Sequence, residues 1–203
     1  MYVKKPGGYA YTEAWPIPQF KGLLDMYFPE TFQNSRWKYW KAILDLKLCG
    51  ECRSHHGKIY SANEIPDMKP PLHVMCRCEI LPMEAIMPGK ATKDGENGAD
   101  YWLTHYGKLP DYYISKEELI ELGWKGSKTI ASKAPGKMYF GGIYNNDDGH
   151  LPSAPGRIWY EADINYYEGR RNRHRILFSN DGLIFVTYDH YQTFYEVYTG
   201  GSE

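Results

Sequence analysis

The sequence predicts an α+β protein in which N-terminal helices are followed by an antiparallel β-sheet, plus a small N-terminal Cys/His metal-binding module. Three observations support this expectation. All four cysteines lie between Cys49 and Cys78, which indicates one local site rather than a disulfide framework. Helix-capping signals occupy residues 99–123, and alternating β-branched and aromatic residues follow Gly156.

The composition excludes several classes of protein. The chain has 203 residues, of which 42 % are hydrophobic, so it can bury a core, and wholesale disorder is excluded. A formal net charge of −1 excludes a strongly basic nucleic-acid coat but not a local basic patch. No apolar run reaches the roughly 18 residues of a membrane span, and no apolar stretch follows the charged N-terminus. We therefore expect no membrane insertion and no signal peptide.

A polar, glycine-rich stretch from Met87 to Gly98 predicts a linker. This gives three expected parts: an N-terminal Cys/His module over residues 1–86, a linker over 87–98 and a second domain over 99–203. Basic residues slightly outnumber acidic ones before the second domain, whereas acidic residues outnumber basic ones within it.

The region before the first cysteine carries mixed signals. Residues 32–48 are compatible with one amphipathic helix, or with a helix followed by a strand. The strand is indicated by Leu44, Leu46 and Leu48, which alternate with charged residues and lead directly into Cys49.

Cys49-Gly-Glu-Cys52 and Cys76-Arg-Cys78 form two thiol pairs with the spacing of a structural zinc site. Zinc requires four ligands in a tetrahedron, and the two pairs together with His73 offer five. Cys49, Cys52 and Cys76 are the first candidates, and the fourth ligand is Cys78 or His73. Two disulfides, or thiols without metal, are the alternatives that this spacing leaves open.

The start of the second domain is expected to be helical. Residues 99–106 form a predicted helix that ends at Gly107, a residue type favoured at a left-handed cap. Ser115 and Glu118 have the spacing of a capping box, and the helix that they begin should stop near Gly123.

After Gly156 the pattern changes to period two, with turn residues between the segments. The first two segments are separated by Glu168-Gly169 and the next two by Asn180-Asp-Gly182. The predicted strands span residues 157–164, 172–179, 183–188 and 192–198.

These turn positions predict which side chains meet. A hairpin centred on Glu168-Gly169 places Glu161 opposite Arg175 or its immediate neighbour, and the following turns bring the loop that carries His190 to the same end of the sheet. Glu161, Arg171, Arg175 and His190 should therefore converge, within a register error of one or two residues.

A carboxylate, an imidazole and two guanidinium groups suit cleavage of an RNA phosphodiester. Glu161 would remove the proton from the ribose 2′-OH, and His190 would protonate the departing 5′-oxygen. Arg171 and Arg175 would stabilise the charge on phosphorus, because arginine is planar, bidentate and always charged. The alternative is a surface ion pair beside an unrelated loop histidine.

The N-terminal module resembles a known family over roughly residues 35–82. Leu44-Asp45, Cys49-Gly-Glu-Cys52, His56-Gly-Lys-Ile-Tyr60 and Pro70-Pro-Leu-His-Val-Met-Cys-Arg-Cys78 are similar to the C-terminal part of the phage Mu F-like minor head proteins. The resemblance implies a virion-associated or export-associated module with a possible metal site, and it implies no catalysis.

Residues 99–198 resemble the barnase family of guanyl-preferring ribonucleases over essentially the whole length of that domain. The similar strings include Lys108-Leu-Pro-Asp111, Ala134-Pro-Gly-Lys137, Glu161-Ala-Asp-Ile-Asn-Tyr166, Arg171-Asn172, Arg175-Ile-Leu177 and Asp189-His-Tyr-Gln-Thr-Phe194. The resemblance implies the microbial ribonuclease fold and a catalysis that needs no metal.

The same resemblance implies roles for individual residues. Glu161 stands at the general base and His190 at the general acid, and the phosphate-contacting positions are held by Arg171, Arg175 and Lys116. Tyr191 stands at a substrate-contacting tyrosine.

The loop Tyr144-Asn-Asn-Asp-Asp-Gly149 is similar to the family's guanine-recognition loop. This implies substrate contacts from Tyr144, Asn146 and Asp148, although the string is also ordinary turn chemistry. Asp147 departs from the family, which has an arginine there, and a negative charge at this position should weaken attraction of phosphate.

Three other histidines are expected to have no catalytic role. Strand alternation turns His174 away from the site, so we expect it to be structural. His150 should be solvated, and His105 should be a surface or core residue of its helix.

The expected function is that of an endoribonuclease toxin. It would cleave single-stranded RNA through a 2′,3′-cyclic phosphate, bind an acidic barstar-like immunity protein, and be exported or delivered into a target bacterial cytoplasm through its N-terminal module. The alternative is a phage structural or delivery protein with an inactive ribonuclease-like binding domain, which Asp147 favours. A DNA-binding zinc module is a weaker third reading, because its charge balance gives little electrostatic attraction.

Overall fold

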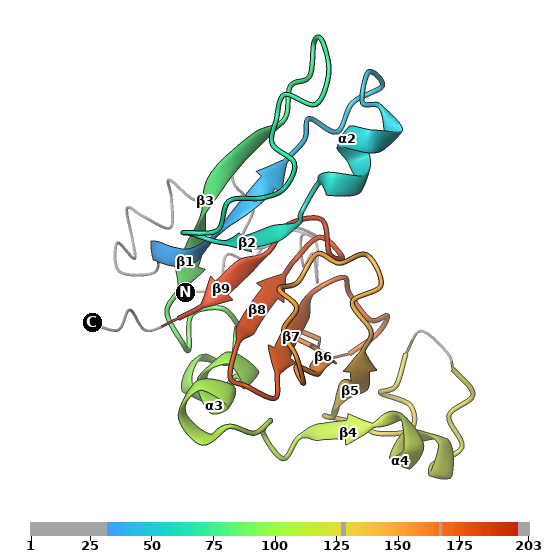
Figure 1. Ribbon diagram of the computed structural model, residues 1–203. Helices are drawn as coiled ribbons and strands as arrows, with labels where there is room; N and C mark the ends of the chain where they lie inside the picture. Colours follow the sequence, from blue (N-terminus) through green and yellow to red (C-terminus); the bar gives the residue numbers. More distant parts are fainter. Residues whose placement is uncertain (1–31, 127–128, 167, 199–203) are drawn as a thin grey trace, which may run out of the picture.

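The computed structural model describes residues 32–126, 129–166 and 168–198, and Figure 1 shows their arrangement. The architecture is mixed α+β, with a nine-stranded sheet in the order β2-β1-β3-β9-β8-β7-β6-β5-β4. The strands are β1 Phe32–Lys41, β2 Ile59–Ser61, β3 Glu79–Ile86, β4 Tyr113–Ser115, β5 Met138–Tyr144, β6 Trp159–Asp163, β7 Arg175–Ser179, β8 Ile184–Thr187 and β9 Tyr195–Val197. The helices are α2 Gly50–His55, α3 Ala99–Tyr106 and α4 Lys116–Glu121, with a 3₁₀ turn at Gly95–Asn97.

The predicted fold class is correct only in its coarse form. The helices do not all precede the sheet, because strands β1 to β3 come before α3 and α4 in the chain. The sheet is also not purely antiparallel, since β3 pairs with β9, and β4 with β5, in parallel.

The two predicted helices of the second half are confirmed. α3 ends at Gly107, whose φ of 65° is the left-handed conformation that glycine adopts without strain. Ser115 caps α4: its hydroxyl accepts from the Glu118 backbone N–H, and its own backbone N–H donates to the Glu118 carboxylate. Both capping signals act within three or four residues, which is why the sequence alone locates these helices.

The prediction for residues 32–48 is wrong. This region forms strand β1 and then an irregular loop, rather than a helix or a strand that reaches Cys49. Leu46 is fully exposed, so the leucine alternation that suggested a strand does not face a core.

The sheet has two buried faces. Alternate residues of β6 to β8, including Ala162, Ile176 and Val186, pack with Leu103 of α3 on one face. Trp159, Leu177 and Phe185 lie on the other face, where the N-terminal residues Ile59, Met83 and Trp37 complete the cluster. The N-terminal module therefore shares a core with the second half of the chain.

An ion pair between the half-exposed Arg36 and the buried Glu196 joins β1 to β9. The Glu196 carboxylate is 0 % exposed, and it accepts hydrogen bonds from the Arg36 guanidinium at 2.6 Å and from the indole N–H of Trp37 at 3.0 Å. Removing either donor would leave the buried Glu196 charge with fewer hydrogen bonds, which is unfavourable. This contact therefore favours the observed docking of the module.

The segment of residues 87–98, expected to be a linker, is packed against the second half. The buried Asp100 carboxylate accepts from the backbone N–H of Gly89 and of Ala91, and Tyr188 donates to the Ala91 carbonyl. A Cβ at Gly98 would lie 1.9 Å from the Thr92 hydroxyl oxygen, so a side chain there would clash. The segment is therefore packed against the second half, and its role as the boundary between two domains stays a prediction.

Candidate active site

Strand β6 places two carboxylates on one face of the sheet. Glu161 and Asp163 are two residues apart, so their side chains point the same way. Gly141 lies in an irregularity of the β5–β6 pairing, and a Cβ there would come within 2.8 Å of the Glu161 side chain. A residue without a side chain is thus needed at 141 for Glu161 to lie across β5.

Glu161 is held by Tyr191, which in turn stacks on Tyr144. The Tyr191 hydroxyl donates a short hydrogen bond to Glu161 Oε2, and the Tyr191 ring stacks on Tyr144 with centroids 5.5 Å apart. Burial and the charge of Glu161 raise the pKa of Tyr191, so its hydroxyl keeps the proton that it donates. This bond fixes the position of one oxygen of the Glu161 carboxylate.

Asp189 organises the loop that carries His190 and Tyr191. Its carboxylate accepts from the backbone N–H of Gln192 and Thr193 and from the hydroxyl of Thr187. The loop closes with His190 at φ 64° and Tyr191 at φ 70°, a left-handed conformation that non-glycine residues rarely adopt. Such backbone persists only where surrounding contacts enforce it, and Asp189 supplies them.

Asp163 holds both arginines. This carboxylate is almost completely buried, accepts from Arg171 Nη2 at 2.8 Å and lies 3.1 Å from Arg175 Nε. The Arg171 guanidinium also lies 4.1 Å from the centre of the Tyr139 ring. The two cations are therefore fixed beside Glu161 on the same face of the sheet.

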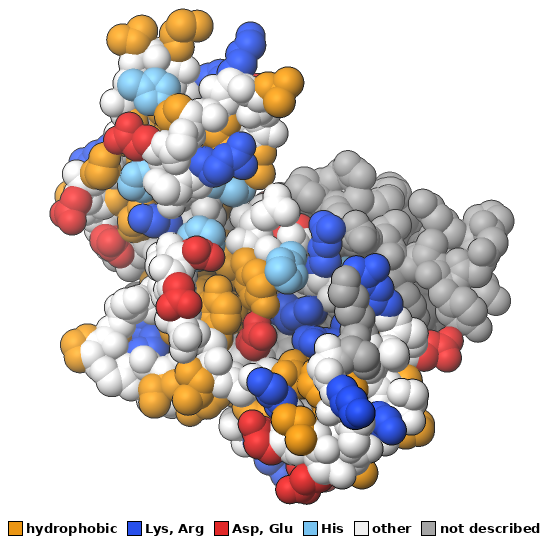
Figure 2. Space-filling view, turned by 90° about the vertical axis from the view of Figure 1, so that its right-hand side faces the viewer, with side chains coloured by type: hydrophobic (Ala, Val, Ile, Leu, Met, Phe, Trp, Pro, Cys, Tyr) orange, Lys and Arg blue, Asp and Glu red, His pale blue; other side chains and the backbone are white. Residues whose placement is uncertain are grey.

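The electrostatics link these groups to His190. Partial burial lowers the pKa of His190, the charges of Arg175 and Arg173 lower it further, and Glu161 opposes the shift without reversing it. Figure 2 shows basic side chains gathered around an acidic one in the middle of this face, with a histidine and hydrophobic side chains beside them.

A pocket of about 610 Å³ adjoins this group, large enough for a nucleobase and its sugar. It is lined by residues 143–148, His150 and residues 190–192. Burial raises the pKa of Tyr144 to about 12, with smaller contributions from Asp148, Glu161 and Asp147, so its hydroxyl stays protonated. Both Asp147 and Asp148 are exposed at the pocket edge.

The Asn146 side chain is occupied within its own loop. Its amide donates to the Leu151 carbonyl at 2.9 Å and accepts from the Leu151 N–H at 3.0 Å, and its φ of 54° is left-handed. Asn146 therefore shapes the loop, and these bonds leave its second amide N–H and its second oxygen lone pair for a contact with substrate.

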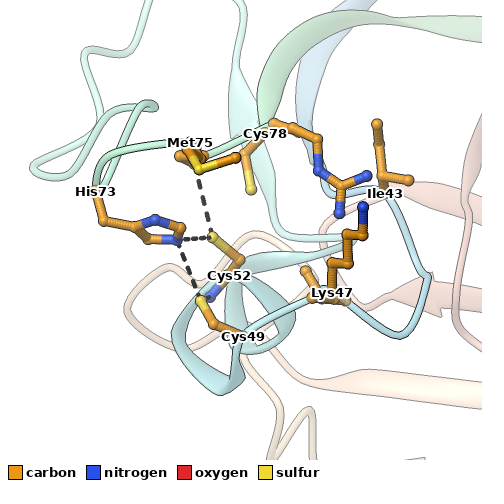
Figure 3. Close-up of a pocket in the computed structure, with 10 residues that line it drawn as sticks. Ile43, Lys47, Cys49, Cys52, His73, Met75 and Cys78 are labelled. Atoms are coloured by element: carbon orange, nitrogen blue, oxygen red, sulfur yellow. Dashed lines mark hydrogen bonds between the residues drawn. The ribbon is translucent and has the colours of Figure 1, made fainter.

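A second cluster lies in the N-terminal module, at α2 and the loop that precedes β3 (Figure 1). The His73 Nε2 atom lies 3.3 Å from Cys49 Sγ and 3.2 Å from Cys52 Sγ, and Cys52 Sγ lies 3.6 Å from Cys76 Sγ. Figure 3 shows the imidazole pointing at the two sulfurs, with Cys78 close by. All four cysteines are free, so the disulfide alternative has no support.

These distances fit a tetrahedral metal. Ligands about 2.3 Å from a zinc ion lie about 3.7 Å apart, close to the separations found here. His73 Nδ1 lies 2.8 Å from the Val74 carbonyl, the contact that leaves Nε2 free to coordinate. The donor atoms of Cys49, Cys52 and His73 form one close group, and those of Cys52, Cys76 and Cys78 form another. Cys52 is common to both.

Comparison with known proteins decides the family. A family model described as ribonuclease matches residues 96–198. A ribonuclease of Heyndrickxia coagulans is 53 % identical over 97 residues, which cover 47 % of this chain and 88 % of that protein. The chain belongs to the ribonuclease family.

Two further ribonucleases, from Bacillus intermedius and Bacillus pumilus, are also 53 % identical over 97 residues, and the chain spans 59 % of the length of each. The model described as phage Mu protein F like protein matches residues 28–81, so both resemblances expected from the sequence are confirmed.

Within the ribonuclease half, the structure gathers most of the residues expected at the site. Tyr191 contacts Glu161, and Arg171 and Arg175 share Asp163. Lys116 is exposed at the start of α4, and its role at phosphate stays a prediction. Glu161 pairs with Leu177, two residues from Arg175, so the hairpin register lies within the expected error of one or two residues.

The burial of the other histidines agrees with the expectation for two of them and differs for the third. His174 is 0 % exposed, as expected for a structural residue, and His105 is exposed on α3. The expectation that His150 is solvated is wrong, because it is half-buried with its ring near Phe194 and its carbonyl bonded to the Ile59 N–H.

Asp163, Asp189 and Gly141 were missed as parts of the ribonuclease site. Strand alternation after Glu161 was a usable signal for Asp163, because it places this carboxylate on the same face and directly opposite Arg175. Gly141 had no signal in the sequence, since its role depends on the side chain of a neighbouring strand.

Proposed function

We propose that this ribonuclease-family chain is an endoribonuclease that cleaves single-stranded RNA by transesterification. The observation that carries the proposal is the arrangement of Glu161, held by Tyr191, beside the Asp163-bound Arg171 and Arg175. The pocket next to His190 gives room for the base on the 5′ side of the scissile bond.

The reaction uses two proton transfers. The Glu161 carboxylate takes the proton of the ribose 2′-OH while the 2′-oxygen forms a bond to phosphorus. The bond from phosphorus to the 5′-oxygen breaks, and the imidazolium of His190 gives that oxygen its proton. The products are a 2′,3′-cyclic phosphate and a 5′-hydroxyl. Arg171 and Arg175, with Lys116 as a further candidate, stabilise the extra negative charge on the equatorial oxygens.

Guanine preference is proposed on the recognition loop. The backbone N–H groups and the Asp148 carboxylate can pair with the O6, N1–H and N2–H₂ groups of guanine, and Tyr144 offers a ring to stack on. Asp147 places a second negative charge at the edge of the pocket, so we expect weaker phosphate attraction than an arginine would provide there.

The direct test is cleavage of GpU, ApU, CpU and UpU together with their 2′-deoxy counterparts. We expect GpU to be cleaved fastest, to yield guanosine 2′,3′-cyclic phosphate, and all 2′-deoxy substrates to resist. Cleavage of the deoxy substrates would contradict attack by the 2′-OH. Absence of cleavage by the folded protein would favour the rival function, an inactive binding domain on a phage structural protein.

For the N-terminal module we propose a structural zinc ion held by Cys49, Cys52, Cys76 and His73, with Cys78 as the alternative to His73. When bound, such an ion cross-links the α2 loop to the loop of residues 70–78 and takes no part in cleavage. The contact of His73 Nδ1 with the Val74 carbonyl supports its choice as fourth ligand.

Purified wild-type protein is expected to contain about one zinc ion per chain by elemental analysis, since this donor set matches a closed structural site. Cys52→Ser should lose the ion, because this residue belongs to both groups of donors. The control His105→Ala changes an exposed histidine outside the cluster and should keep it. Loss of zinc in His73→Ala but not in Cys78→Ser would identify the fourth ligand, and a folded zinc-free wild type would contradict the proposal.

The proposed biological role is that of a toxin. An acidic barstar-like protein would complement the cations beside Glu161, and the phage Mu F-like module would connect the nuclease to export or virion machinery. No helix in the described part of the chain is long and apolar enough to cross a membrane.

A further inference from the structure

The N-terminal module contacts the walls of the nucleotide pocket directly. The Ile59 N–H donates to the His150 carbonyl at 2.9 Å, immediately after the recognition loop. A Cβ on Gly57 would lie 3.1 Å from the Gln192 carbonyl oxygen and 3.7 Å from the His150 ring. His150 and Gln192 both line the pocket, so one short segment contacts its two loops.

That segment is itself firmly held. The Gly57 N–H donates to the Trp40 carbonyl and the Trp40 N–H to the Lys58 carbonyl, both at 2.9 Å. His56 Nδ1 accepts from the Ala42 N–H at 3.1 Å, and the fully buried Trp40 ring stacks on His55 with centroids 4.6 Å apart. Strand β1 therefore supports residues 55–58 with contacts that a loose surface loop would lack.

The backbone at Gly57 accounts for the close approach. Its φ of 86° lies in the left-handed region, and its open face is directed at the Gln192 carbonyl. Gln192 follows the loop in which Asp189 holds His190 and Tyr191. Because Gln192 also lines the pocket, a displacement at residue 57 would be transmitted to that wall of the pocket.

The contacts come from outside the matched ribonuclease stretch, because the ribonuclease family model begins at residue 96. The segment instead lies within the part that matches the phage Mu protein F like model. Any effect of this segment on the pocket therefore depends on both matched stretches being present in one chain.

We propose that residues 56–59, here called the brace, are a positioning element that sets the nucleotide pocket of the ribonuclease site. Gly57 and Ile59 are positioning residues, since they act through His150 and Gln192 and not on the RNA. The proposal rests on the proposed function for its substrate class. Holding two loops in their binding geometry before substrate arrives lowers the cost of ordering them, so the brace raises affinity for the base rather than the rate of the chemical step.

The test compares Gly57→Ala with Gly107→Ala. Both changes place alanine at a left-handed backbone position, but a Cβ at Gly107 meets nothing within 4 Å, and this residue ends α3 on the opposite face of the sheet. Thermal melting of both variants shows whether their losses of stability are comparable. The dissociation constant for the 2′-deoxy dinucleotide dGpU and the KM and kcat for GpU are then measured.

For Gly57→Ala we expect the dissociation constant and KM to rise about tenfold, while kcat changes much less. The added Cβ pushes against the Gln192 carbonyl oxygen and displaces this wall of the pocket. Hydrogen exchange in residues 144–151 and 189–194 should become faster in this variant alone. Gly107→Ala should leave dGpU affinity and both segments unchanged. Equal affinity for dGpU and equal hydrogen exchange in the two variants would overturn the proposed role of the brace, even if the wild type cleaves RNA. A wild type that binds dGpU without cleaving RNA would refute only the proposed function.

Discussion

Replacing Glu161 by glutamine, or His190 by alanine, is expected to lower kcat/KM for RNA cleavage by about a thousandfold, because each change removes a proton-transfer group. Glutamine keeps the size of Glu161 and can still accept from the Tyr191 hydroxyl, so the Glu161→Gln protein should fold normally. The measurement is cleavage of GpU at a fixed pH, with circular dichroism of each variant.

The controls change the same residue types elsewhere. Glu168→Gln alters an exposed carboxylate in the β6–β7 turn, and His105→Ala alters an exposed imidazole on α3. Both should cleave at the wild-type rate. The double variant of Glu161 and His190 should lose little more than either single one, because the two groups act in one step. Wild-type cleavage by either single variant would rule out the assigned roles.

The pH dependence checks the role of His190 as acid. Only its protonated form can act, so activity is present below its pKa and is lost as pH rises through it. Because burial, Arg175 and Arg173 lower this pKa, the loss should occur at a lower pH than for an ordinary histidine. Arg173→Gln removes one of these charges, so the loss of activity should occur at a higher pH than in the wild type. If activity were lost at the same pH in both proteins, a group other than His190 would supply the proton.

Replacing Asp163 by asparagine is expected to lower the free energy of unfolding by about 3–5 kcal/mol and to abolish most activity, because two cations lose a shared buried counter-charge. The Arg175 side chain is 8 % exposed and that of Arg171 is 21 % exposed, so neither can be fully solvated where it lies. Chemical denaturation and GpU cleavage measure the two effects.

Asp181→Asn is the matched control. It also removes a carboxylate bound to an arginine, Arg157, but the Asp181 side chain is 45 % exposed, so the expected cost is about 0–1 kcal/mol. If Asp163→Asn were no more destabilising than Asp181→Asn, the arginines would not depend on Asp163. Loss of stability with full activity would separate the structural role of Asp163 from the proposed positioning of phosphate.

The sequence alone located the elements whose signals are local. The capping box of Ser115 and the left-handed glycine after α3 act within one turn of helix, and the Asn180-Asp-Gly182 turn fixes the β7–β8 hairpin within one residue. The same turns, read with the family resemblance, selected Glu161, Arg171, Arg175, His190 and Tyr191 as one group. Strand β4 escaped notice because it has only 3 residues, and β5 because it contains two glycines.

Residues 32–48 illustrate a failure of periodicity. The leucine alternation before Cys49 resembled a strand, but Leu44 and Leu46 lie exposed in a loop, Leu48 is only partly buried, and β1 ends earlier. Periodicity identifies the face that a segment could bury, but it does not determine whether another element is present to cover that face.

Local signals in the sequence thus determined the helix caps and the β7–β8 hairpin, and the family resemblance singled out the candidate reactive side chains. Tertiary structure alone decided that the N-terminal module extends the ribonuclease sheet through β3 and β9, that Asp163 binds both arginines, and that Gly57 approaches Gln192. The physical reason is range. Caps and turns depend on hydrogen bonds between residues a few positions apart, whereas these contacts join distant segments, and their energy arises only when the folded chain removes the shared charges and apolar surfaces from water.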